Sequence, residues 1–205
     1  MTDDDRQFGA WRDGDRTAGE ALIERHFDAI ERFFATKAPD AREDLVQRTF
    51  LACAEAVKSY RAEGGFRAFL FGIARNVLFE HIRGRVRHGA QPADFSQSGI
   101  ADLSPGVSTL TEYRAEQRSL VGALQRLPLE LQLLVELYYW EELGVDELAA
   151  VLEVPPGTIK SRLHRARTLL AEAMAETPPE SEEDGSVRAL LLDWLAGVKA
   201  RAPRA

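Results

Sequence analysis

Apolar residues recur at helical spacing along most of the chain, and no segment shows the strict alternation that marks a half-buried strand. The repeat predicts one helix for each of the following ranges: 18–36, 41–58, 66–87, 111–126, 128–140, 145–152 and 156–174. In the second of these, Val46, Phe50, Cys53 and Val57 share one face and leave an acidic, polar face outside. The pattern therefore predicts an all-α fold.

Two segments interrupt the helical pattern and divide the chain. Residues 88–110 are rich in Gly, Pro, Ser, Asp and Gln with little apolar periodicity, and residues 177–185 are Pro-rich and acidic. Both compositions are typical of flexible linkers. We therefore expect two small helical domains joined by a flexible linker, plus a C-terminal helical extension. The expected blocks are a tail at 1–17, a domain at 18–88, a linker at 89–118, a domain at 119–175 and an extension at 176–205.

The formal charge of −7 conceals two basic patches. Residues 61–88 hold six basic and two acidic residues, and residues 156–175 hold four basic and one acidic. Overall acidity disfavours indiscriminate binding to nucleic acid, whereas a local patch can still contact phosphates. The charge balance therefore does not exclude DNA as a partner.

Several classes of protein are disfavoured by composition. No apolar run approaches the roughly 20 residues that span a bilayer, and the N-terminus is acidic where a signal peptide would be basic, so we expect a cytoplasmic protein without membrane insertion. Cys53 is the only cysteine, which excludes an internal disulfide and a thiolate metal cluster. The four histidines lack ligand spacing with carboxylates, and no Gly-rich phosphate loop follows a strand. We expect no cofactor, no metal and no enzymatic activity.

The segment GVDELAAVLEVPPGTIKSRLHRARTLL has the layout of a helix-turn-helix. A short helix with Leu148 and Leu152 facing inward is followed by the turn EVPPG and then by a basic helix. This second helix of the motif would enter the major groove. The predicted buried face of the basic helix holds Ile159, Leu163, Ala166 and Leu170. The candidate DNA-contacting residues are Thr158, Lys160, Ser161, Arg162, His164, Arg165 and Arg167. A solvated amphipathic helix has the same periodicity, and the preceding short helix and turn favour DNA binding.

The stretch from Leu127 to Met174, which contains this motif, resembles region 4 of the extracytoplasmic-function sigma factors of bacterial RNA polymerase. That region reads the minus 35 promoter element. Two stretches of the first half, DAREDLVQRTFLACAEAV and GGFRAFLFGIARNVLFEHIRGRVR, resemble region 2 of the same family, in the family's order. The resemblance implies a sigma factor that binds core RNA polymerase and directs promoter-specific transcription initiation.

The resemblance also implies roles for residues of the first domain, which would bind core polymerase and open the minus 10 element. Asp44 and Gln47 match positions that dock on the clamp helices of the largest polymerase subunit. The candidates for the minus 10 element are Tyr60, Arg75, Asn76, Arg83, Arg85 and Arg87. Tyr60 and Phe66 are candidates for a pocket that holds an extruded base, although core packing explains an aromatic residue equally simply and is favoured for Phe66. Asn76 is the candidate for reading a base edge, and the arginines for holding phosphate.

Three positions depart from the family pattern. Arg48 stands where an acidic residue is usual, Phe69 where tryptophan is usual, and Glu80 where aspartate is common. The change at position 69 preserves the packing character of the site. The change at position 48 leaves open how closely the charges of this helix match those of the polymerase clamp.

Two other functions remain open on the residues alone. One is a one-component transcription regulator, with a helical sensing or dimerisation module on a helix-turn-helix domain. The other is a protein that sequesters a polymerase subunit. The resemblance further allows an anti-sigma factor or another regulator as a partner. The apolar stripe of the extension, which includes Leu191 and Trp194, would either engage a domain or a regulator, or merely complete a hydrophobic surface.

Overall fold

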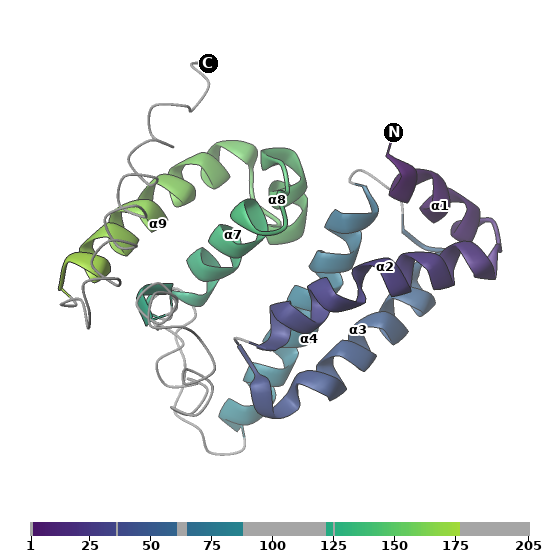
Figure 1. The fold of residues 1–205 in the computed structure, drawn as a ribbon, viewed down its shortest axis with the longest axis horizontal. Helices are drawn as coiled ribbons and strands as arrows, with labels where there is room; N and C mark the ends of the chain where they lie inside the picture. Colours follow the sequence, from purple (N-terminus) through teal and green to yellow (C-terminus); the bar gives the residue numbers. More distant parts are fainter. Residues whose placement is uncertain (1, 36, 61–64, 88–121, 125, 177–205) are drawn as a thin grey trace, which may run out of the picture. The chain divides into compact units, whose positions relative to one another are not determined.

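The computed structural model describes residues 2–35, 37–60, 65–87, 122–124 and 126–176, without the side chains of 86, 87 and 174–176. These residues form helices and no strand, as the sequence pattern predicts (Figure 1). The elements are α1 (Asp3–Arg12), α2 (Arg16–Ala35), the short 3-10 helix η1 (Pro39–Ala41), α3 (Arg42–Ala56), α4 (Phe66–Arg87), α7 (Leu129–Tyr139), α8 (Val145–Leu152) and α9 (Pro156–Glu176).

The predicted helices correspond to observed ones wherever the residues are described. The ranges 66–87 and 145–152 coincide with α4 and α8, and the other described helices differ from their predicted ranges only near the ends, where helix limits are least sharply defined. Of the helix predicted at 111–126, only 122–124 is described as helical. The apolar stripe of the C-terminal extension lies outside the described residues.

The structure places an additional helix, α1, in the N-terminal segment that the sequence pattern treats as a tail. Thr2 caps this helix in a reciprocal arrangement. The Asp5 N–H donates to Thr2 Oγ1 at 3.1 Å, and the Thr2 N–H donates to Asp5 Oδ2 at 2.9 Å. Such a capping box satisfies backbone donors that a helix start leaves unpaired. Because Phe8 is the one buried residue that α1 contributes, the segment carries no apolar periodicity.

Two compact units divide the chain: one holds residues 1–93 and 136–160, and the other holds 94–135 and 161–205. In the first unit α2, α3 and α4 lie side by side, and α1 packs on α2 (Figure 1). Their facing sides are apolar, and Leu22, Ile30, Leu45 and Leu70 are fully buried. Burial of such side chains stabilises the bundle by roughly 1.5–3 kcal/mol for each.

The approach of α1 to α2 depends on two glycines. Gly14 has φ +108° in the connecting turn, a conformation that favours glycine. Asp15 then caps the start of α2, because its Oδ1 accepts the N–H of Thr17 at 3.0 Å. A Cβ atom at Gly19 would lie 2.5 Å from Nε1 of Trp11, so the small residue lets the indole of α1 lie directly on α2.

The second unit has its own apolar interior. Its buried side chains include Leu133 and Leu134 of α7 and Leu163 and Leu170 of α9. This unit holds residues 161–176 of α9, whereas α8, the turn and the start of α9 belong to the first unit. The buried side of α9 fixes which side of that helix is left for a ligand.

Candidate nucleic-acid interface

The turn between α8 and α9 is tight and is built from local backbone contacts. At the start of α8, the Gly144 N–H donates to Oε2 of Glu147 at 2.8 Å. After α8 ends, Glu153 adopts a left-handed conformation with φ 56°, and the Val154 N–H donates to the Ala149 carbonyl at 3.1 Å. This is the geometry by which helices commonly end. Pro156 then opens α9, a position at which its missing N–H costs nothing.

One face of α9 is apolar and buried, as the sequence spacing predicts. Ile159, Leu163, Ala166 and Leu170 are all buried. The other face presents polar and basic side chains to solvent, and its exposed members among the candidate residues are Lys160, Ser161, His164 and Arg165. A helix that is packed on one side and carries exposed donors on the other has the form of a recognition helix.

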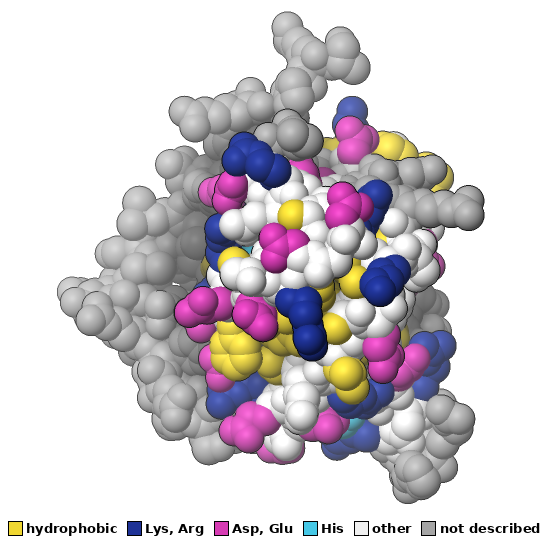
Figure 2. Space-filling view, turned by 90° about the vertical axis from the view of Figure 1, so that its right-hand side faces the viewer, with side chains coloured by type: hydrophobic (Ala, Val, Ile, Leu, Met, Phe, Trp, Pro, Cys, Tyr) yellow, Lys and Arg dark blue, Asp and Glu magenta, His cyan; other side chains and the backbone are white. Residues whose placement is uncertain are grey.

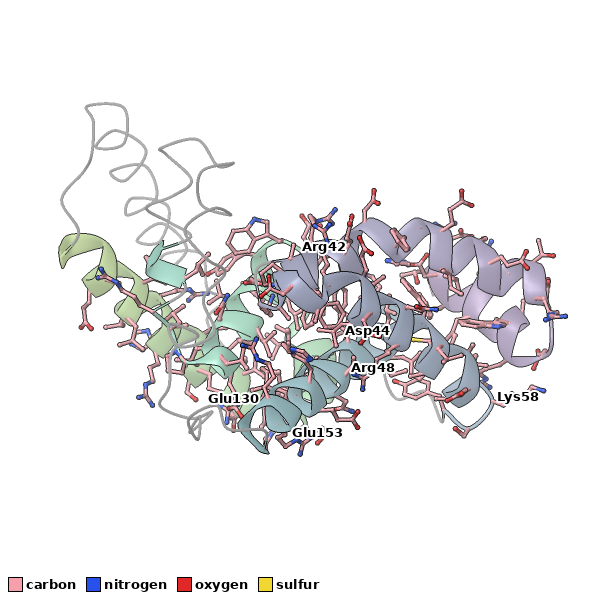
Figure 3. All side chains as sticks on the ribbon, turned by 90° about the horizontal axis from the view of Figure 1, so that it is seen from below. Arg42, Asp44, Arg48, Lys58, Glu130 and Glu153 are labelled. Atoms are coloured by element: carbon pink, nitrogen blue, oxygen red, sulfur yellow. The ribbon has the colours of Figure 1, made fainter. Side chains whose placement is uncertain are left out.

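The remaining candidates on α9 are only half-exposed. They are Thr158, Arg162 and Arg167. Arg162 forms an ion pair with Glu130 of α7, with Nη1 3.0 Å from Oε2; Figure 3 labels Glu130. Because this carboxylate already neutralises part of the guanidinium charge, Arg162 has less charge to offer a phosphate than Arg165.

A second set of candidates lies along α4. Asn76, Arg83 and Arg85 are exposed, and Arg75 is half-buried. The side chain of Arg87, at the end of this helix, lies outside the described residues. Arg83 and Arg85 are therefore exposed cations, which suit contact with phosphates.

Phe79 of α4 contacts two of these arginines, Arg75 and Arg83. The guanidinium carbon of Arg75 lies 4.9 Å from the centre of the Phe79 ring, within the range of a cation–π contact. Nε of Arg83 donates to the Phe79 carbonyl at 3.2 Å. Both arginines therefore contact Phe79, Arg75 through the ring and Arg83 through the backbone carbonyl.

His81 on the same helix adds no positive charge near neutral pH. Burial lowers its pKa below the ordinary value for histidine, and the positive charges of Arg85 and Arg48 lower it further. The cations available on α4 are its arginines.

The two candidate aromatic residues differ in exposure. Phe66 is buried, which confirms that it packs in the core. Tyr60, just beyond α3, is half-buried, and its ring lies 4.3 Å from that of Phe69. The residue that the sequence did not reveal is Phe8 of α1, which contacts all three rings. We call Phe8, Tyr60, Phe66 and Phe69 the aromatic cluster.

The candidate polymerase-binding residues lie on the outer face of α3. Asp44 and Gln47 are exposed, and Figure 3 shows Asp44 and Arg48 on this helix. Nη1 of Arg48 lies 3.9 Å from Oδ2 of Asp44. Leu51, which the sequence pattern did not single out, extends this outer face by one turn with 59% of its surface exposed.

Other kinds of site are not found among the described residues. No group of three or more His, Cys, Asp and Glu side chains there is placed to hold a metal ion. None of the described helices combines the length and the apolar character needed to cross a membrane. Figure 2 shows acidic and basic side chains interspersed, with hydrophobic ones between them, on the face that it views. The described part of that face therefore offers no continuous basic surface.

Comparison with solved structures shows a shared fold. The sigma factor RpoE in complex with the anti-sigma factor NepR, from Bartonella quintana, matches with a TM-score of 0.58 and 23% identity over 78% of this chain and 98% of that chain. CnrH in complex with the cytosolic domain of CnrY matches with a TM-score of 0.58 and 21% identity over 85% of this chain and 99% of that chain.

Comparison with sequences gives the family. Residues 22–88 match the family described as Sigma-70 region 2, and residues 117–170 match Sigma-70, region 4. The ECF RNA polymerase sigma factor SigE of Mycolicibacterium smegmatis is 31% identical over 169 residues, which span 80% of this chain and 64% of that relative. The ECF RNA polymerase sigma factor SigC of Mycobacterium tuberculosis is 33% identical over 172 residues, which span 78% of this chain and 85% of that relative. The chain therefore belongs to the extracytoplasmic-function sigma factors of the sigma-70 family, and its function is that of a promoter-directing sigma factor.

Proposed function

We propose that this chain binds core RNA polymerase, opens the minus 10 element with its 18–88 domain and reads the minus 35 element with the helix-turn-helix of its 119–175 domain. Residues 89–118 link the two domains. Polymerisation chemistry belongs to the polymerase, and the chain is not itself an enzyme. It acts where polymerase and promoter DNA are, in the cytoplasm. The observation that carries the proposal is α9, with its apolar side buried and its polar, basic side exposed directly after a tight helix-turn-helix connection.

At the minus 35 element, we assign the main contacts to the exposed candidates of α9. Ser161 and His164 carry hydrogen-bonding groups suited to base edges, and Lys160 and Arg165 carry charges suited to either phosphate or guanine. Arg162, Arg167 and Thr158 take secondary roles because they are less exposed.

At the minus 10 element, we assign phosphate contacts to Arg75, Arg83, Arg85 and Arg87. An opened strand needs a surface on which an unstacked base can lie, and an aromatic side chain supplies it. Tyr60 is exposed enough for that role, and Asn76 is placed on the outside of α4 with donors and an acceptor for a base edge.

For core polymerase, we assign the clamp contact to Asp44 and Gln47 on α3. An anti-sigma factor or another regulator is a further proposed partner, in keeping with the structurally similar sigma factor RpoE, which is in complex with the anti-sigma factor NepR. A one-component regulator is the alternative function. It would bind duplex DNA as a dimer, without stable binding to core polymerase.

Transcription with purified core polymerase tests the proposal. Templates with a randomised promoter region are transcribed with and without the full chain, and the products are sequenced. We expect the chain to enrich one class of promoter, and Arg165→Ala and Asp44→Ala each to reduce the yield. Arg12→Ala and Asp28→Ala remove exposed charges of the same kinds from α1 and α2 and serve as matched controls. No enrichment over core polymerase alone would overturn the proposal.

A further inference from the structure

Helix α1 contributes a phenylalanine to the aromatic cluster, which joins the end of α3 to the start of α4. The ring of Phe8 lies 5.7 Å from that of Tyr60, 5.2 Å from that of Phe66 and 5.1 Å from that of Phe69. These separations are typical of interacting aromatic pairs. Phe8 is 3% exposed, so its ring is enclosed by the cluster.

A carboxylate of α1 lies at the start of α4. The Phe66 N–H donates to Asp5 Oδ1 at 3.4 Å, and a Cβ at Gly65 would lie 2.7 Å from the same oxygen. Asp5 therefore occupies the N-terminus of α4, where an anion is favoured by the helix dipole. A DNA phosphate is excluded from that point, and phosphate contacts are left to the arginines farther along α4.

Polar contacts of α1 also fix its position on α2. Oδ2 of Asp4 lies 2.7 Å from Nε2 of His26, and Asp4 also pairs with Arg25. Asp3 pairs with Arg25 at 3.2 Å, and Trp11 lies against Gly19. The position of the Phe8 ring is thus fixed both by the ion pairs of α1 to α2 and by the cluster itself.

Within the cluster only Tyr60 has surface left for a ligand. Phe8, Phe66 and Phe69 are buried, whereas Tyr60 is half-buried. The packed part of its ring rests on Phe8 and Phe69. Without the Phe8 ring, Tyr60 would lose one of these two supports, and its side chain would gain rotational freedom that a bound base must then restrict.

We propose that Phe8 is a positioning residue for the minus 10 element: it holds Tyr60 in the orientation in which an unstacked base lies on the tyrosine ring. The proposal rests on the proposed function and extends it, because it makes the N-terminal helix part of the surface that recognises the opened strand. Phe8 itself does not touch DNA, and its effect is transmitted through Tyr60.

The test measures binding of an opened strand to holoenzyme. A short single strand is first selected from a randomised pool on wild-type holoenzyme and then labelled with fluorescein. Phe8→Leu keeps an apolar side chain and removes the ring, and we expect it to weaken strand binding about tenfold, the scale of one lost base stack. Phe8→Tyr keeps an aromatic ring at this position and should bind the strand as the wild type does. Affinity of each variant for core polymerase stays as in wild type.

A matched variant separates positioning from loss of stability. Phe33 of α2 is also buried and has ring contacts of its own, with Phe34 and Phe71, outside the cluster. We expect Phe33→Leu to lower the free energy of unfolding as much as Phe8→Leu does, without weakening strand binding. If both variants weaken strand binding equally, Phe8 has only a structural role and the proposal is overturned.

A double-mutant cycle shows whether Phe8 acts through Tyr60. In a Tyr60→Ala background, Phe8→Leu should cause no further loss of strand binding, and an undiminished tenfold loss overturns the proposal. Failure of the proposed function has a different signature. Wild-type holoenzyme would then select no strand at all, and this inference would fall with it, whereas equal binding by wild type and Phe8→Leu would overturn this inference alone.

Discussion

Arg48 of α3 and Glu80 of α4 form an ion pair, with Nη2 of the arginine 3.2 Å from Oε2 of the glutamate. Both positions depart from what the family resemblance implies, an acidic residue at 48 and an aspartate at 80. The structure makes the two departures partners, since the longer glutamate side chain reaches an arginine on the neighbouring helix. Arg48 also lies near Asp44. Its positive charge is therefore partly neutralised by carboxylates of its own domain.

We expect this pair to stabilise the domain only weakly. The side chains of Arg48 and Glu80 are 42% and 61% exposed, and exposed pairs contribute about 0.2–1 kcal/mol. Urea unfolding of the wild type, Arg48→Ala, Glu80→Ala and the double variant gives the coupling energy. It should shrink when salt is added, and a coupling above about 2 kcal/mol would contradict this prediction.

The contribution of Asp5 to stability should depend on pH. The backbone N–H of Thr2 is the largest cause that lowers the pKa of the Asp5 carboxyl, with further help from the Thr2 hydroxyl and the Phe66 N–H against the opposing effect of burial. A carboxyl whose pKa is lower in the folded state stabilises the fold above its unfolded pKa, and this stabilisation is lost as the pH falls through the folded value. The wild type should therefore have a higher Tm than Asp5→Asn at neutral pH, and this difference in Tm should shrink below about pH 4.

A control distinguishes this effect from loss of any surface charge. Asp28→Asn removes an exposed carboxylate from α2 and should not reproduce the change in Tm at neutral pH. If Asp5→Asn and the wild type melt at the same temperature at neutral pH, the capping contacts of Asp5 do not stabilise α1.

Cys53 should be inert in the folded chain. It is buried in α3, and burial raises the pKa of its thiol to about 12. Because the thiolate is the reactive form, iodoacetamide at neutral pH should label the native chain far more slowly than the chain in urea. Mass spectrometry of timed samples measures both rates. Equal rates would mean that α3 opens readily on the timescale of labelling.

Two arginines of α9 should differ in their effect on the salt dependence of binding to duplex DNA. Arg165 is exposed, and Arg165→Ala should make the slope of log K against log salt shallower by about one. Arg162 is paired with Glu130, so Arg162→Ala should change the slope less. Fluorescence anisotropy at several salt concentrations gives the slopes. Equal changes would show that Arg162 leaves Glu130 to reach a phosphate.

The elements that the sequence predicts are those with several apolar residues on one face. The buried residues of α9 recur at intervals of three and four, so both the helix and its exposed side follow from periodicity. Helix α1 has one buried residue, Phe8, and no periodicity. Its only local signals are the spacing of Thr2 and Asp5 and the acidic first turn.

The relationships that the sequence does not predict join residues that are distant along the chain. Arg48 with Glu80, Arg162 with Glu130 and Phe8 with Tyr60 are each brought together by the packing of separate helices. No local pattern reports such pairs, because each residue is by itself an ordinary charged or aromatic side chain. The candidate surface can thus be located from periodicity, whereas the effective charge of each arginine cannot.

The contacts of Phe8 also bear on the order in which this bundle folds during synthesis. Helix α1 leaves the ribosome before the other helices of this bundle, and Phe66 and Phe69, on which its buried ring rests, are made only after α2 and α3 are complete. At about 5–20 residues per second, the Phe8 ring lacks these partners for several seconds, although α2 is complete earlier and can already bind α1. The packing of the Phe8 ring into the aromatic cluster is therefore among the last steps by which this bundle becomes stable.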